Sequence, residues 1–137
     1  MKPYIVIQGP VATRSGYGAH TRELVSSLLN EKRYDIDIIS LPWGDTPMNA
    51  LDQNNEEHRE ILSHIATSNI TRKPDVWIQV SIPSEFQSIG KYNIGVTAGF
   101  ETDVIPADQL EGCNRMDLII TTSQHSKDVI MKTNFDW

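Results

Sequence analysis

The chain has 137 residues, of which 39% are hydrophobic and 22% charged, and its formal net charge at pH 7 is −6. This length and composition are typical of one globular domain with a real hydrophobic core, not of a disordered segment. The acidic balance argues against a nucleic acid or an anionic membrane as partner, because both need clustered lysine and arginine.

The sequence also carries information on the compartment. A single cysteine, Cys113, leaves no intramolecular disulfide, and no apolar run approaches the ~20 residues of a membrane span. The first residues lack the basic, apolar and small-residue order of a signal peptide. We therefore expect a cytoplasmic protein without a membrane span, in which the glycosylation sequon at residues 69–71 is a chance match.

The first half of the chain predicts two strands and two helices. Residues 4–8 are β-branched and apolar, which predicts a buried strand, and residues 35–41 predict a second strand. Between them, a loop over residues 9–18 leads into an amphipathic helix. Helical spacing resumes over residues 56–68.

The second half continues in the same manner. Further strands are predicted over residues 76–80, 91–98 and 117–122. Residues 83–90 predict a loop, and Pro106 suits the first turn of a short helix, where its missing N–H does no harm. Ser123 is placed to cap a last helix that runs through about Lys132.

The strands are apolar on both faces and mostly alternate with helices. That combination favours a parallel sheet buried between helices. The sequence therefore predicts a Rossmann-like α/β fold, an open, mostly parallel sheet with helices on both faces, as a single domain over residues 1–137.

Ligands of open parallel sheets bind at the carboxyl ends of the strands. The segments at that edge span residues 9–20, 41–47, 81–87, 99–105 and 122–127. We expect the binding residues of this protein among them.

The first of these loops is the most informative. Ser15, Gly16, Tyr17 and Gly18 come just before a helix, whose N-terminus offers free N–H groups and a partial positive charge. A phosphate or a sugar hydroxyl suits such a place, and Arg14 could add a charge-assisted bond. The alternative is a tight turn that needs glycine for its backbone conformation.

Other candidates are single polar or aromatic side chains. His20 either donates to a ligand oxygen or packs against the sheet edge, and Trp43 is placed to stack on a sugar. Glu101 and Asp103 follow the fourth strand and could bind acceptor hydroxyls or supply a base, or simply be solvated. His125 is more typical of a solvent-facing residue.

Cofactor and metal motifs are missing. The segment over residues 16–21 has only two of the three glycines of a dinucleotide fingerprint, and its loop is too long for that motif. No Gly-Lys-Ser/Thr sequence occurs, and His58 and His64 do not have the spacing of a helical zinc pair. We expect neither a cofactor nor a metal ion.

Four segments, in chain order, resemble a known family. They span residues 9–24, 75–86, 92–102 and 113–127. With the Ser-Gly-Tyr-Gly-x-His sequence at residues 15–20, they resemble the first loop and helix, the third and fourth strands with their loops, and the fifth strand and following helix of group 1 glycosyltransferases. These are the retaining enzymes of the glycogen synthase and sucrose synthase-like superfamily.

The resemblance implies a transferase of two Rossmann domains with a cleft between them. Its substrates would be a nucleotide-sugar donor and an acceptor, either a small molecule or a glycan. This chain would be the N-terminal, acceptor-side half, inactive alone. The C-terminal half, which holds most of the donor and carries two glutamates separated by seven residues, would be its missing partner domain.

The resemblance also implies positions for single residues. Gly16 and Gly18 would face the donor diphosphate, and Glu101 and Thr102 would lie near the transferred sugar. Many relatives carry a histidine in that last loop, which this sequence lacks. Cleft positions are further implied for Ser123 and Ser126. Retaining members need no dedicated protein base, so no catalytic residue is predicted.

Two other functions compete with this interpretation. The glycine loop and the strand ends would equally suit a non-enzymatic module that binds a nucleotide or a sugar. A dinucleotide-dependent oxidoreductase domain is disfavoured by the length of the first loop.

Overall fold

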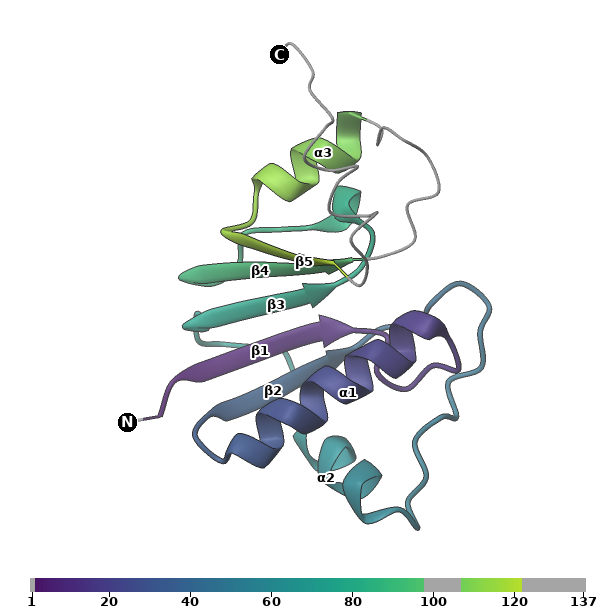
Figure 1. Cartoon of the computed structure of the whole chain (residues 1–137). Helices are drawn as coiled ribbons and strands as arrows, with labels where there is room; N and C mark the ends of the chain where they lie inside the picture. The colour runs from purple at the N-terminus through teal and green to yellow at the C-terminus, as the bar shows by residue number, and fades with distance from the viewer. Residues whose placement is uncertain (1, 98–106, 122–137) are drawn as a thin grey trace.

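The computed structural model describes residues 2–97 and 107–121, which form a single parallel sheet with helices (Figure 1). The strands are β1 (Tyr4–Gly9), β2 (Asp35–Ser40), β3 (Val76–Val80), β4 (Tyr92–Thr97) and β5 (Leu118–Thr121). The helices are α1 (Gly16–Glu31), α2 (Glu56–His64) and α3 (Ala107–Asn114), with a short 3-10 helix η1 (Pro83–Glu85). The predicted Rossmann-like α/β class is confirmed.

The strand order is β2-β1-β3-β4-β5, and every neighbouring pair is parallel. The chain leaves β1 toward one side to form β2, and then returns past β1 to form β3. Adjacent strands whose connections leave in opposite directions form a topological switch point, outside which ligands of such sheets bind. In this sheet the switch point lies between β1 and β3.

One face of the sheet carries the main hydrophobic core. Ile5 and Ile7 of β1 pack there with Val25 and Leu29 of α1 and with Ile61 of α2. Ile7 and Val25 are fully buried. Burial of one such side chain stabilises a fold by about 1.5–3 kcal/mol, so this cluster fixes α1 against the sheet.

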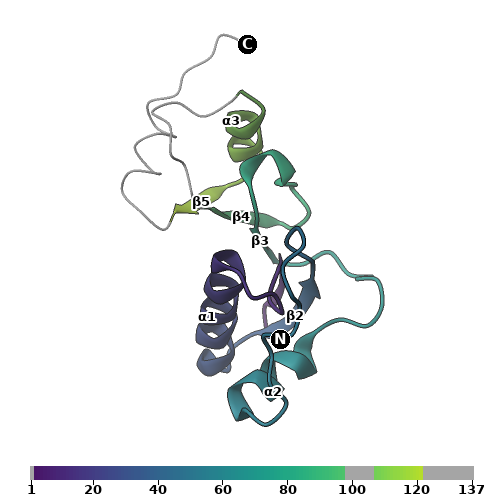
Figure 2. The ribbon, with the colours of Figure 1, turned by 90° about the vertical axis from the view of Figure 1, so that its right-hand side faces the viewer.

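The opposite face has a smaller cluster. Tyr4, Val6 and Trp77 are buried there, with Ile70 and Met116 packed against them. Figures 1 and 2 show α1 and α2 beside the β1–β2 half of the molecule and α3 beside the β4–β5 half. Since Met116 comes just after α3 and packs on this second face, helices flank both faces, as predicted.

Helix α2 is shorter than the sequence predicts, because it ends at His64 and not near residue 68. Ile65 forms a parallel bridge with Ile38, and the N–H of Ala66 donates to the carbonyl of Ile38 at 2.8 Å. A helix cannot continue through residues whose backbone pairs with a strand. Residues 65 and 66 thereby pair with Ile38 at the outer edge of β2, where backbone groups would otherwise be unpaired.

Between β3 and β4 the predicted loop is present, and it contains η1. The buried amide of Gln79 holds this loop, since its Nε2 donates to the carbonyl of Glu85 at 2.7 Å and its Oε1 accepts from the N–H of Gln87 at 3.0 Å. Phe86 is fully buried against Gly95, where a side chain would lie 2.6 Å from its ring. One side-chain amide thus satisfies backbone groups that a helix would pair internally.

The remaining predicted elements are only partly covered by the described residues. Strand β5 falls within the predicted range. Pro106 and the predicted helix from Ser123 to Lys132 lie outside the described residues. No helix within residues 2–97 and 107–121 is long and apolar enough to cross a membrane.

Candidate functional site

A cavity of about 360 Å³ lies at the carboxyl ends of the first three strands. Pro10 follows β1, Leu41 to Gly44 follow β2, and Ser81 and Ile82 follow β3. All three segments meet at the switch point between β1 and β3. The cavity has the size of a small-molecule site and the position that the topology favours.

The polar groups of this cavity come from the end of β3. Ser81 is 7% exposed, and its Oγ donates to Oε1 of Glu85 at 3.1 Å. Among the described residues of the lining, Glu85 is the one ionisable side chain. Its carboxylate is oriented by a neighbouring hydroxyl, and no lysine, arginine or histidine within residues 2–97 and 107–121 lines the cavity.

Trp43 also lines the cavity, and it connects the cavity to the glycine loop. Its ring stacks on Tyr17, with ring centroids 4.2 Å apart and planes 25° from parallel. The Tyr17 hydroxyl lies 3.4 Å from the hydroxyl of Thr97, at the end of β4. The two predicted aromatic candidates are thus in contact, Tyr17 from α1 and Trp43 from the loop after β2.

Ser15 acts as the N-cap of α1. Its Oγ accepts from the N–H of Gly18 at 2.9 Å and lies 2.8 Å from the hydroxyl of Thr13. Such a cap stabilises a helix by about 1 kcal/mol. The hydroxyl that the sequence assigns to substrate is therefore engaged in holding the loop.

The two glycines of the motif differ sharply. A Cβ at Gly18 would lie 2.3 Å from the carbonyl oxygen of Thr13 and 2.9 Å from that of Pro10, whereas a Cβ at Gly16 would meet no atom of the described residues within 4 Å. Neither glycine has a positive φ. Packing of the loop on the helix explains Gly18, while Gly16 leaves the start of α1 open to approach.

Two arginines fix the loop from either side. Arg14 Nε donates to Oδ1 of Asn49 at 2.7 Å, which directs its guanidinium toward the segment after β2. Arg22 Nη1 donates to the carbonyls of Val11 and Thr13, at 3.0 and 2.7 Å. Burial, followed by the nearby charge of Arg14, lowers the pKa of Arg22. Arg14 and Arg22 therefore hold the loop in place through contacts within the protein.

The other predicted site residues fall into two groups. His20 is half-buried on the first turns of α1. Residues outside the described ranges are Glu101, Thr102, Asp103, Ser123, His125 and Ser126. Within residues 2–97 and 107–121, no group of three or more His, Cys, Asp or Glu side chains could hold a metal ion.

The structure adds Ser81 and Glu85, which sequence reasoning did not single out. Both lie in the segment over residues 81–87 that the strand-end rule had selected. A polar residue directly after a buried strand, with a carboxylate one helical turn later, was the available signal. That spacing alone does not predict the hydroxyl–carboxylate pair, because the pair forms only when η1 turns Glu85 back toward Ser81.

In comparisons with known proteins, no protein-family model, no curated protein and no solved structure matches the chain.

Proposed function

We propose that this chain is the acceptor-side domain of a glycosyltransferase, and that the cavity beside Trp43 binds a sugar. The observation that carries the proposal is a cavity of about 360 Å³ at the switch point, lined by an indole and by a hydroxyl–carboxylate pair. Sugar rings present C–H faces that pack on aromatic rings, and hydroxyls that donate to carboxylates. Trp43 and Glu85 supply one partner of each kind.

The charge of the lining favours the acceptor over the donor. Of the lining residues that the structure describes, Glu85 alone is ionisable, so a nucleotide diphosphate would meet a carboxylate there and no cation from these residues. The open N-terminus of α1 at Gly16 suits a phosphate better, because helix N-termini attract anions. The donor would accordingly lie between this helix end and a second domain.

A sugar titration followed by NMR tests the proposal. In the ¹⁵N-labelled chain, methyl glycosides should shift the indole N–H signal of Trp43 and leave that of the buried Trp77 in place. Trp43→Ala should lower the affinity at least tenfold, and Glu85→Gln should lower it less. Absence of any saturable shift at Trp43, over a panel of neutral and amino sugars, would sink the proposal.

Matched controls separate local binding from general effects. Met48→Ala alters an exposed residue of the same loop as Trp43, and Glu57→Gln removes a carboxylate from the exposed side of α2. Both variants should bind the sugar like the unaltered chain. A loss of affinity in these controls would mean that the Trp43 result reflects the loop as a whole.

A non-enzymatic sugar-binding module is the second candidate, since this chain alone supplies Trp43, Ser81 and Glu85 of the cavity. The two functions differ in turnover. In the full-length protein, Trp43→Ala should slow release of nucleoside diphosphate from a nucleotide sugar in the presence of acceptor. Binding at Trp43 with no turnover for any donor would favour the module.

A further inference from the structure

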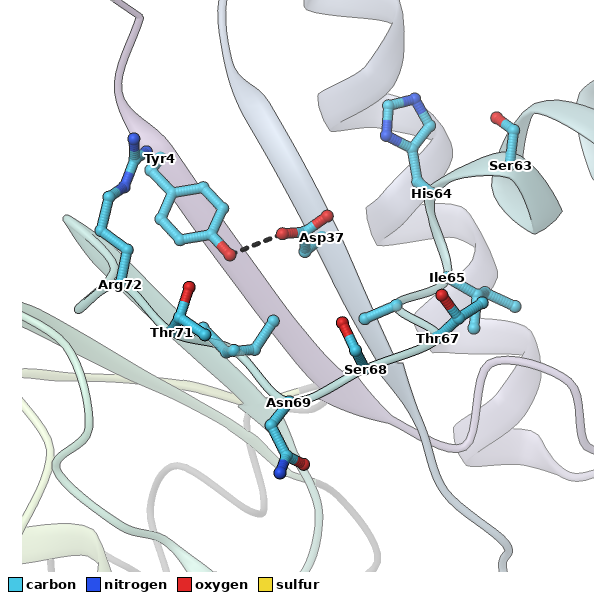
Figure 3. A pocket seen from close by; sticks show the side chains of 12 residues that line it. Tyr4, Asp37, Ser63, His64, Ile65, Thr67, Ser68, Asn69, Thr71 and Arg72 are labelled. Carbon is cyan, nitrogen blue, oxygen red and sulfur yellow. Dashed lines mark hydrogen bonds between the residues drawn. The ribbon is translucent and has the colours of Figure 1, made fainter.

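A second cavity, of about 330 Å³, lies on the opposite side of the sheet from α1. Its walls are the first residue of β1, the middle of β2, and residues 63–72, which lead from α2 back toward β3 (Figure 3). It shares no lining residue with the cavity at the strand ends. The two cavities are therefore separate candidate sites.

Asp37 supplies a negative charge to this cavity. The side chain is half-buried and accepts a hydrogen bond of 2.5 Å from the hydroxyl of Tyr4. An ionised carboxylate has room for about four hydrogen bonds. In the part of the chain that the structure describes, the carboxylate of Asp37 forms no ion pair, and this is its one hydrogen bond.

Arg72 supplies a positive charge to the same cavity. Its guanidinium carbon lies 4.1 Å from the centroid of the Tyr4 ring, a cation–π contact. Within residues 2–97 and 107–121 its guanidinium forms no hydrogen bond and no ion pair, although its charge also acts on Asp75. Figure 3 shows Arg72 and Asp37 on opposite sides of Tyr4, so the two charges border one cavity without pairing with each other.

Hydroxyl groups lie beside these charges. Ser68 and Thr71 line the cavity, and Figure 3 shows their hydroxyls on the side of Tyr4 and Asp37, whereas Asn69 is directed away. The tyrosine keeps the carboxylate and the guanidinium apart. A bound molecule that carried an ammonium and a carboxylate a few bonds apart would satisfy both.

We propose that this cavity is a binding site for a free α-amino acid. The ammonium group donates to the carboxylate of Asp37, and the carboxylate accepts from the guanidinium of Arg72, which suits planar oxyanions. The cavity is at the small end of the usual range for ligand sites, in keeping with a molecule of this size. The inference does not rest on the proposed sugar site.

The test is an NMR titration of the intact chain with each of the twenty common amino acids, observed at Tyr4 and at the backbone of residues 66–72. At least one should give saturable shifts. Its analogues with a single charge should bind at least tenfold more weakly; for L-alanine these are ethylamine and propionate. No saturable shift with any amino acid, or equal binding of a singly charged analogue, would overturn the proposal.

Two variants assign the charges. Asp37→Asn and Arg72→Gln should each lower the affinity at least tenfold, with controls Asp52→Asn and Lys73→Gln unchanged. Arg72 is exposed, so its replacement leaves the fold intact even if Asp37→Asn perturbs it. Unchanged affinity in Arg72→Gln contradicts the proposal. Preferential binding of an uncharged polyol such as glycerol at this place would equally contradict it.

Discussion

The cavity beside Trp43 and the cavity beside Tyr4 lie toward opposite ends of β1 and are lined by different kinds of side chain. At the carboxyl end, Trp43 and Glu85 combine an aromatic ring with a carboxylate. Near the amino end, Asp37 and Arg72 place opposite charges around Tyr4. The first arrangement suits a neutral polyhydroxyl compound and the second a zwitterion.

The comparison shows how differently such sites arise. The cavity at the carboxyl end follows from the strand order, since any sheet with this order opens a crevice between its first and third strands. The cavity near the amino end exists because α2 stops at His64 and an irregular segment crosses the sheet in place of a helix. Only the first is a property of the fold class.

The largest effect is expected from Gly18→Ala, which would displace the loop over residues 10–15 that supports the carboxyl-end cavity. The new Cβ would lie 2.3 Å from the carbonyl oxygen of Thr13, so the loop must move. We expect a loss of about 3 kcal/mol in the free energy of unfolding, measured by urea denaturation. Sugar binding at Trp43 should weaken as well, because Tyr17 would shift.

Gly16→Ala is the matched control for that variant. Its Cβ meets nothing within 4 Å, so the free energy of unfolding should stay within about 0.5 kcal/mol. The bulkier Gly16→Val should likewise preserve the fold but abolish activity of a complete enzyme, by blocking approach to the helix N-terminus. Equal destabilisation by Gly16→Ala and Gly18→Ala would refute this distinction between the two glycines.

The next largest effect is expected on the pKa of Tyr4, which lines the amino-end cavity. Burial and then the hydrogen bond and charge of Asp37 raise the pKa of Tyr4 to about 12. Asp37→Asn should lower this pKa toward 10 without reaching it, since the burial remains. Titration of tyrosine absorbance at 295 nm, with Tyr4→Phe to assign the transition, measures the change.

The same shift has a consequence for stability. A tyrosine whose pKa is raised by folding stabilises the native state below its unfolded pKa of about 10, and this contribution disappears as the pH rises toward 12. The unaltered chain should therefore lose stability over that interval more steeply than Tyr4→Phe. Parallel curves for the two proteins would mean that folding does not raise the pKa of Tyr4.

The sequence predicted the sheet well because its strands are short apolar runs between breakers. The strand at Val76–Val80 is predicted to the residue, and those beginning at Tyr4 and Asp35 end within one residue of the prediction. The end of α2 was wrong, since the pairing of Ala66 with Ile38 is a tertiary contact that local spacing does not encode.

The candidate sites were less predictable for the same reason. The strand-end rule selected the loops that carry Trp43 and Glu85, but the contact between Trp43 and Tyr17 joins residues far apart in the chain. Asp37 and Arg72 could not have been paired at all. Their proximity depends on which face of the sheet the segment after α2 crosses, and hydrophobic periodicity contains no information about that face.

The smallest effect on stability is expected at Asp75, which connects the start of β1 to the start of β3 beside the amino-end cavity. Its carboxylate accepts from the backbone N–H of Tyr4 at 2.8 Å and pairs with Lys91 at 3.1 Å. The Tyr4 bond first, and Lys91 second, lower the pKa of Asp75. A lowered carboxyl pKa stabilises the fold above the unfolded value of about 3.9, and that contribution is lost as the pH falls through the folded value.

Asp75→Asn should therefore flatten the decline in unfolding free energy below pH 4, relative to the unaltered chain and to the exposed control Asp45→Asn. If Asp75→Asn also weakened amino-acid binding, the register of β1 would be part of what builds the second cavity, whereas unchanged binding would confine that site to Asp37 and Arg72.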